Sequence, residues 1–149
     1  MRLAAVRSDR PSFTSWDGTR ICFYELGNLE AERTLLFVNG LFCTESYYLF
    51  LHRELAPHYR IVGFDLRGHS ASQPPIDPSH ATIQACARDA VALLDHLGVA
   101  RVVMAGLSLG VQIGFETYRR YPERIRALMA FTGPYQNPLG TLYGMKVPD

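Results

Sequence analysis

Hydrophobic residues along this chain alternate between short continuous runs and one long stretch with helical spacing. The continuous runs at 34–38 and 59–66 are typical of strands buried on both faces of a parallel sheet. Further apolar runs at 101–105 and 125–131 predict two more strands. From residue 83 onward the apolar positions recur every three or four residues, which predicts a helix, at Ile83, Cys86, Ala87, Ala90, Leu94 and Leu97.

Turn and capping residues mark where these elements begin and end. Asp17-Gly18 lies between the apolar segments 13–16 and 21–26 and favours a β-hairpin. Thr82 is a suitable N-cap for the helix that begins at Ile83, and Gly98 a suitable stop. The polar residues of that helix are expected on its solvated face, namely Arg88, Asp89 and Asp95. Shorter helices are expected over 47–55 and from Leu109 to Pro122.

A hairpin followed by alternating strands and helices predicts an α/β fold with a mostly parallel sheet and helices on both faces. In such sheets, functional sites form beyond the carboxyl ends of the strands. Three loops follow predicted strands, at 39–43, 65–72 and 106–110. We therefore expect these loops to meet in space.

The third of these loops is the most informative one, because Gly106-Leu107-Ser108-Leu109-Gly110 joins a strand to a helix. A Gly-x-Ser-x-Gly sequence in this context is typical of a nucleophile elbow, a sharp turn that presents a reactive serine. Gly106 and Gly110 would leave the turn room to form, and the amide of Leu109 at the helix start would face negative charge developing on a substrate. The alternative is that Ser108 merely caps an ordinary helix.

The histidines are all in the wrong place to complete a Ser-His-acid triad. Every one of them precedes Ser108, whereas the elbow-type triad has the chain order serine, acid, histidine. We expect the base to be missing from these 149 residues, and the isolated chain to be close to inactive. The five histidines are His52, His58, His69, His80 and His96.

Composition excludes several classes of function. Hydrophobic residues make up 48% of the 149 and charged residues 19%, and the net charge is +1, so neither nucleic acid nor an anionic membrane is an expected partner. No stretch resembles a signal peptide or a membrane span. The odd, unclustered set of Cys22, Cys43 and Cys86 indicates a reducing compartment, and we expect a cytoplasmic protein. No phosphate loop, dinucleotide fingerprint or metal-ligand spacing is present, so no cofactor and no metal are expected.

The loop that runs from Asp65 to Ser72 (Asp-Leu-Arg-Gly-His-Ser-Ala-Ser) is similar to a motif of the α/β-hydrolase fold family, Asp-x-Arg-Gly-x-Gly-x-Ser. With the elbow and the 39–43 loop in the correct order, residues 1–149 resemble the N-terminal half of such a protein, as one domain without its C-terminal strands and helices. The resemblance implies a bare edge on the 125–131 strand, where self-association is expected.

The same resemblance assigns roles to individual residues. Ser108 matches the nucleophile, and the amides of Leu109 and Leu41 match the oxyanion hole. Two positions depart from the family pattern: Asn39 stands where histidine is common, and Ser70 where glycine is common. We expect Asn39 still to hydrogen-bond within its loop. Asp65 and Arg67 are expected to form a structural ion pair, and His69 to brace its loop.

The resemblance implies a serine hydrolase that acts on an ester or a similar acyl compound, a small-molecule substrate. Other reaction classes occur on the same fold, so an acyltransferase, a lyase and a cofactor-free haloperoxidase-like enzyme stay open. A non-catalytic binding module is a further alternative. Aromatic side chains that could line an apolar substrate pocket are Phe42, Tyr47, Tyr48 and Tyr135.

Overall fold

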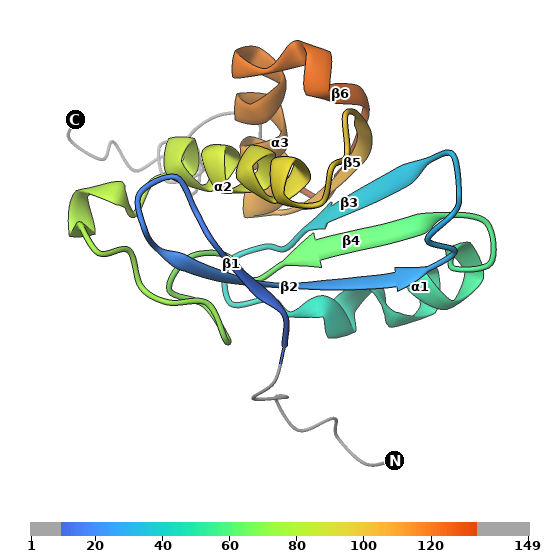
Figure 1. Ribbon diagram of the computed structural model, residues 1–149, viewed down its shortest axis with the longest axis horizontal. Coiled ribbons are helices and arrows are strands. Elements are labelled where there is room, and N and C mark those ends of the chain that lie inside the picture. Colours follow the sequence, from blue (N-terminus) through green and yellow to red (C-terminus); the bar gives the residue numbers. More distant parts are fainter. Residues whose placement is uncertain (1–9, 134–149) are drawn as a thin grey trace.

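A six-stranded sheet forms the centre of the molecule, as seen in a computed structural model that describes residues 10–133 (Figure 1). The strands lie in the order β1-β2-β4-β3-β5-β6. β1 and β2 form the predicted hairpin and β2 runs antiparallel to β4, whereas β4, β3, β5 and β6 are parallel. The mostly parallel α/β fold is thereby confirmed. The strands are β1 (Ser12–Thr14), β2 (Arg20–Gly27), β3 (Thr34–Val38), β4 (Arg60–Phe64), β5 (Val102–Leu107) and β6 (Ile125–Phe131).

Helices cover both faces of this sheet, with α2 and α3 on one side and α1 on the other (Figure 1). Thr82 caps α2 by accepting a hydrogen bond from the amide of Ala85 at 3.1 Å, as the sequence predicts. None of the helices in the described part of the chain is long and apolar enough to cross a membrane. The helices are α1 (Leu49–Leu55), α2 (Ile83–His96) and α3 (Leu109–Arg120), with short 3₁₀ turns at η1 (Glu45–Tyr48), η2 (Pro78–His80) and η3 (Pro122–Arg124).

Alternating strand residues divide the core into two clusters, one on each face of the sheet. Leu36 and Val38 pack with Leu93 and Leu94 of α2 in the cluster that we call the α3-side core. Phe37 lies in the cluster on the opposite face, the α1-side core, with Leu35, Ile61 and Tyr48. Because successive residues of a strand point to opposite faces, one run of apolar residues supplies both clusters.

The expectation that Asp89 lies on a solvated helix face is wrong. Asp89 is fully buried and accepts two hydrogen bonds from Arg67, at 2.8 and 2.6 Å, and one from the hydroxyl of Ser15 at 2.6 Å. The hairpin turn and the loop after β4 cover this part of α2, so the carboxylate is removed from water and its charge is compensated by a guanidinium. Arg88 and Asp95 are exposed, as expected.

The expected ion pair between Asp65 and Arg67 is also wrong. Arg67 reaches Asp89 and the hairpin residue Asp17, whereas Asp65 pairs with Arg10 at 3.2 Å. The chain turns directly after β4, where the amide of His69 donates to the carbonyl of Leu66, so the two side chains leave toward different neighbours. Burial alone would raise the pKa of Asp17, but hydrogen bonds from Arg67 and Thr19 outweigh it and lower that pKa.

Candidate active site

The three loops meet as predicted, because they follow the adjacent parallel strands β4, β3 and β5. A Cβ atom placed on Gly40 would lie 3.1 Å from the Cβ of Ser108, so the 39–43 loop touches the elbow. On its other side this loop reaches the 65–72 loop, where the rings of Phe42 and His69 are 5.6 Å apart. The candidate site therefore combines segments that are far apart in the sequence.

Ser108 has a strained backbone at the junction of β5 and α3. Its φ and ψ are 52° and −112°, a conformation that a residue other than glycine rarely adopts. The turn is held by a hydrogen bond from the Ser108 amide to the carbonyl of Phe131 and one from the Val111 amide to the carbonyl of Ser108, both 3.0 Å. The exposed Ser108 side chain does not cap α3, which contradicts the alternative of an ordinary capping serine.

Both glycines of the elbow are required by close backbone contacts. A Cβ atom on Gly106 would lie 2.3 Å from the carbonyl oxygen of Gly110, and one on Gly110 would lie 2.2 Å from the carbonyl oxygen of Val38. Real Cβ atoms do not approach other atoms this closely. The first turn of α3 can therefore lie directly beside the end of β3 only because these positions lack side chains.

Two backbone amides border the Ser108 turn without a hydrogen-bond partner among residues 10–133. One belongs to Leu109, the first residue of α3, where helical amides have no partner within the helix. The other belongs to Leu41, inside a turn that is closed by the amide of Cys43 donating to the carbonyl of Gly40 at 3.1 Å. Amides at a helix start also carry the positive end of the helix dipole, so they suit a negatively charged ligand atom.

The four aromatic residues expected around the substrate do not form a common wall. Phe42 and Tyr47 are 85% and 68% exposed on the 39–43 loop and on η1. Tyr48 instead lies in the α1-side core, where its hydroxyl donates to the carbonyl of Val38 at 3.0 Å and burial raises its pKa. Its role as a pocket residue is corrected to a core role, because η1 turns it beneath β3. Tyr135 lies outside the described residues.

None of the histidines is hydrogen-bonded to the Ser108 hydroxyl in the described part of the chain. The Nδ1 atom of His69 lies 3.1 Å from the carbonyl of Arg67, in agreement with the loop-bracing role expected for it. His52 is buried among aromatic rings, and burial lowers its pKa. Of the other three, His80 contacts Asp17, His96 stacks on Phe13, and His58 is exposed after α1. Among residues 10–133, no histidine therefore accepts the hydrogen bond through which a base would take the proton of the Ser108 hydroxyl.

Asn39, one of the two departures from the family pattern, lacks the hydrogen bond expected for it. Asn39 is only 1% exposed, yet neither its Oδ1 nor its Nδ2 atom has a hydrogen-bond partner, so the loop hydrogen bond expected for it is absent. The sequence pattern marks Asn39 as a departure from the family, but it does not indicate that the side-chain amide would lack a hydrogen-bond partner. Ser70 has a φ of 49°, so the loop keeps a left-handed conformation although the residue is not glycine.

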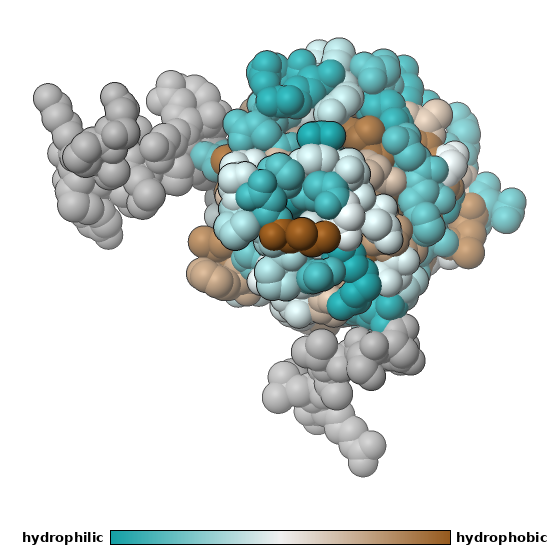
Figure 2. All heavy atoms as spheres, turned by 60° about the vertical axis from the view of Figure 1, so that its left-hand side comes forward, coloured by the Kyte–Doolittle hydropathy of each residue, from teal (hydrophilic) through white to brown (hydrophobic). Residues whose placement is uncertain are grey.

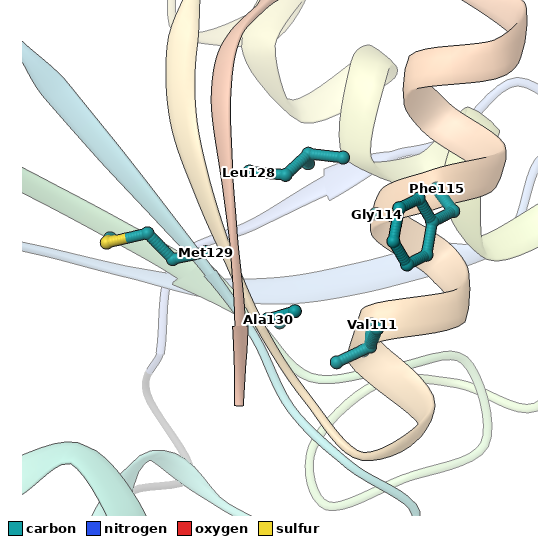
Figure 3. A pocket seen from close by; sticks show the side chains of 8 residues that line it. Val111, Gly114, Phe115, Leu128, Met129 and Ala130 are labelled. Carbon is teal, nitrogen blue, oxygen red and sulfur yellow. The ribbon is translucent and has the colours of Figure 1, made fainter. Parts of the chain in front are cut away.

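Beside the elbow, a small apolar pocket lies between α3 and β6 (Figure 3). Its lining contains no ionisable side chain: Gly106, Gly110, Val111, Gly114, Phe115, Leu128, Met129 and Ala130. The carboxyl ends of the parallel strands come forward in Figure 2, where the surface is largely hydrophilic or neutral with small separate hydrophobic areas. Among the described residues, no three His, Cys, Asp or Glu side chains are grouped so as to hold a metal ion.

Comparison with known proteins agrees with this architecture. Residues 33–145 match the family model for the alpha/beta hydrolase fold. The chain is 31% identical over 101 residues to 3-oxoadipate enol-lactonase 2 of Acinetobacter baylyi, covering 67% of this chain and 37% of the relative. It is 30% identical over 111 residues to the dihydrolipoyllysine-residue acetyltransferase component of an acetoin cleaving system from Pseudomonas putida, covering 74% of this chain and 29% of the relative.

Solved structures give the same result. A hydrolase from Pseudomonas aeruginosa superimposes with a TM-score of 0.81 at 28% identity, over 89% of this chain and 49% of that one. The chain therefore spans about half the length of this structure, and about a third of the length of the two curated relatives.

Proposed function

Because the chain belongs to the alpha/beta hydrolase fold family, we propose that it carries the nucleophile of a serine hydrolase acting on an ester or a similar acyl compound. The observation that carries this proposal is the geometry of Ser108: an exposed side chain on a strained turn, with two unpaired amides beside it. Strain of this kind costs roughly 1–3 kcal/mol, and residues held in such conformations cluster at active sites.

In the proposed reaction the Ser108 hydroxyl loses its proton to a base and attacks the carbonyl carbon of the substrate. The carbonyl oxygen becomes an oxyanion, and the amides of Leu41 and Leu109 donate hydrogen bonds to it. Collapse of this intermediate expels the alcohol, which takes up the proton, and leaves an ester between the acyl group and Ser108. Water then releases the acid by the same steps. One oxyanion-hole donor is worth about 10²–10³ in turnover in comparable enzymes.

Residues 109–149 contain no histidine, so they do not supply the base of the proposed triad, and the segment 132–137 after β6 contains no carboxylate for its acid. We therefore propose that the base and the acid come from sequence beyond this chain. Loss of the base from a Ser-His-acid triad lowers turnover by about 10⁶. This factor corresponds to roughly 8 kcal/mol of barrier. The 149 residues on their own are proposed to be nearly inactive, although the oxyanion amides would retain some catalysis.

Acyl transfer is a second candidate function, because an acetyltransferase component is among the relatives. The two reactions share the acyl-serine and differ in the acceptor, which is water in hydrolysis and another nucleophile in transfer. The proposed substrate is in both cases a small acyl compound. We propose a reducing, cytoplasmic location, which the free thiols of Cys22, Cys43 and Cys86 support.

Reaction with a fluorophosphonate probe, followed by peptide mass mapping, tests the nucleophile. We expect slow labelling of Ser108 in the 149-residue chain and fast labelling in a longer version that contains a later histidine. Ser108→Ala should abolish the label, whereas Ser79→Ala, at an exposed serine on η2, should not change it. A Ser108→Ala protein labelled at the parental rate would exclude Ser108 as the nucleophile, and fast labelling of the short chain at neutral pH would show that it holds its own base.

A further inference from the structure

His69 holds an unpaired hydrogen-bond acceptor at the edge of the candidate active site. Its Nδ1 atom lies 3.1 Å from the carbonyl oxygen of Arg67, and because a carbonyl oxygen only accepts, Nδ1 carries the proton of the neutral ring. The lone pair of the ring is therefore on Nε2. That atom is buried and has no hydrogen-bond partner among the residues that the structure describes. Buried polar atoms in proteins are nearly always paired, so this exception favours a role in binding a ligand.

The position of the His69 ring is fixed without any contribution from Nε2. The amide of His69 donates to the carbonyl of Leu66, and the carbonyl of His69 accepts from the amide of Ser72, both at 2.9 Å. The Nδ1–H group adds a third hydrogen bond, to Arg67. Bracing of the loop therefore uses one nitrogen of the ring and leaves the other available for binding.

Phe42 lies beside this ring, on the loop that carries the Leu41 amide. The two ring centroids are 5.6 Å apart, and the ring planes are inclined by 39°. Phe42 has a φ of 58°, which a bulky residue rarely adopts, and it is 85% exposed. Because His69 is held by three hydrogen bonds and Phe42 by few contacts, Phe42 is the ring that can move and open Nε2 to a ligand.

We propose that His69 is a substrate-binding residue, whose Nε2 atom accepts a hydrogen bond from a hydroxyl or N–H group of the substrate when the ring of Phe42 moves aside. This inference rests on the proposed function and deepens it, because it names the class of substrate: an acyl compound that carries a hydrogen-bond donor. A site built around such an acceptor discriminates against analogues without the donor, since they leave the acceptor unpaired.

The sheet sets the distance between this donor and the reacting carbonyl group. β4 leads to the loop of His69 and β5 leads to Ser108, and β3 lies between these two strands. Neighbouring strands are about 4.8 Å apart, so the two loops begin about 10 Å from each other. The donor therefore belongs on a part of the substrate that is several bonds away from the ester carbonyl, across the 39–43 loop.

Nuclear magnetic resonance of the Ser108→Ala chain tests binding in the absence of reaction. The ligands are ethyl hexanoate and the same ester with a hydroxyl at the far end of its acyl chain, at about pH 8, above the usual titration range of histidine. We expect the hydroxyl ester to shift the ¹⁵N signal of His69 Nε2 and ethyl hexanoate to leave it unchanged. The exposed His58 should respond to neither ester. An Nε2 signal that stays unchanged up to the solubility limit of the hydroxyl ester would overturn the proposal.

Two substitutions separate the acceptor from the loop brace. The side-chain amide of asparagine can still donate to the carbonyl of Arg67 but does not reach the position of Nε2, whereas glutamine can place its amide oxygen there. In the Ser108→Ala chain, the hydroxyl ester should bind about tenfold more tightly than ethyl hexanoate, as followed by the amide signal of Leu41. His69→Asn should abolish this preference and His69→Gln should keep part of it, and circular dichroism checks that both fold. A His69→Asn protein with the full preference would overturn the proposal.

Failure of this proposal can be told from failure of the proposed function. Labelling of Ser108 by the fluorophosphonate probe, without any response of Nε2 to the hydroxyl ester, would overturn the role of His69 and leave the serine nucleophile in place. A response of Nε2 in a chain whose Ser108 is never labelled would support the binding role of His69 and exclude the nucleophile.

Discussion

Arg67 and Asp89 form a bidentate ion pair in the interior, with N–O distances of 2.8 and 2.6 Å. Their side chains are 2% and 0% exposed. The pair joins the loop after β4 to α2, and Asp17 extends it to the β1–β2 hairpin at 2.9 Å from Arg67. The same loop carries His69, which contacts Phe42 beside the candidate site. One buried guanidinium thus ties the 65–72 loop, which borders the candidate site, to α2 and to the β1–β2 hairpin.

Asp89→Ala is expected to destabilise the fold by about 3–5 kcal/mol, because it leaves the Arg67 charge buried with only one of its two carboxylate partners. Urea denaturation measures the change in the free energy of unfolding. Asp95→Ala is the matched control on the same helix: its exposed pair with Arg124 should contribute no more than about 1 kcal/mol. Equal effects of the two substitutions would contradict the interpretation of the buried pair.

Gly110→Ala and Gly114→Ala should have opposite effects although both lie in α3. A methyl group on Gly110 would meet the carbonyl oxygen of Val38 at 2.2 Å, so the helix must move, at an expected cost of about 1–3 kcal/mol. At Gly114 the nearest atom is the Cδ2 of Leu128 at 3.4 Å, and alanine should stabilise the helix by up to about 1 kcal/mol. Thermal unfolding of both variants checks the sign of each change.

The sequence could predict the sheet and the elbow because both depend on local patterns. Continuous apolar runs such as 34–38 specify buried strands, and the spacing of Gly106, Ser108 and Gly110 specifies the turn. The buried ion pair could not be predicted in this way. Ser15 and Asp89 are 74 positions apart, and the helical spacing of α2 does not reveal that a hairpin turn covers its polar face.

Tyr47 and Tyr48 show a second limit of the sequence pattern. They are neighbours at the end of a 3₁₀ turn that leads into α1, and one is 68% exposed while the other is 5% exposed. Because a 3₁₀ turn and an α-helix rotate side chains by different angles per residue, the spacing alone does not tell which tyrosine faces the sheet. The unpaired amide of Asn39 is likewise a property of packing.

The folding stability should decrease as the pH is lowered through the range in which His52 takes up a proton. Its ring lies 4.6 Å from the ring of Phe37 and 5.6 Å from those of Tyr24 and Tyr48, an environment in which burial lowers its pKa. The unfolded chain therefore binds the proton more readily than the folded one. The contribution of neutral His52 is fully present above a pH of about 6.5 and is lost as the pH falls through its lower folded pKa.

Urea denaturation between about pH 7.5 and 5 measures this effect in the parent and in His52→Leu. The parent should lose stability over this interval, and the variant should lose less because it has no proton to gain. His58→Leu, at an exposed histidine after α1, is the control and should keep the parental slope. Identical slopes in all three proteins would show that burial of His52 does not contribute to the pH dependence.

Ser108→Gly should make the fold more stable while it removes the proposed chemistry. Glycine adopts a φ of 52° with a ψ of −112° far more readily than serine, so the substitution relieves strain of roughly 1–3 kcal/mol. The greater freedom of glycine in the unfolded chain offsets about 0.5–1 kcal/mol of this gain. We therefore expect a net stabilisation of about 1 kcal/mol by urea denaturation, together with complete loss of fluorophosphonate labelling.

Ser79→Gly, in a 3₁₀ turn without such strain, should instead lose stability. A destabilised Ser108→Gly protein would mean that the turn stores no strain, and would contradict a fold that holds this serine in a strained conformation for catalysis.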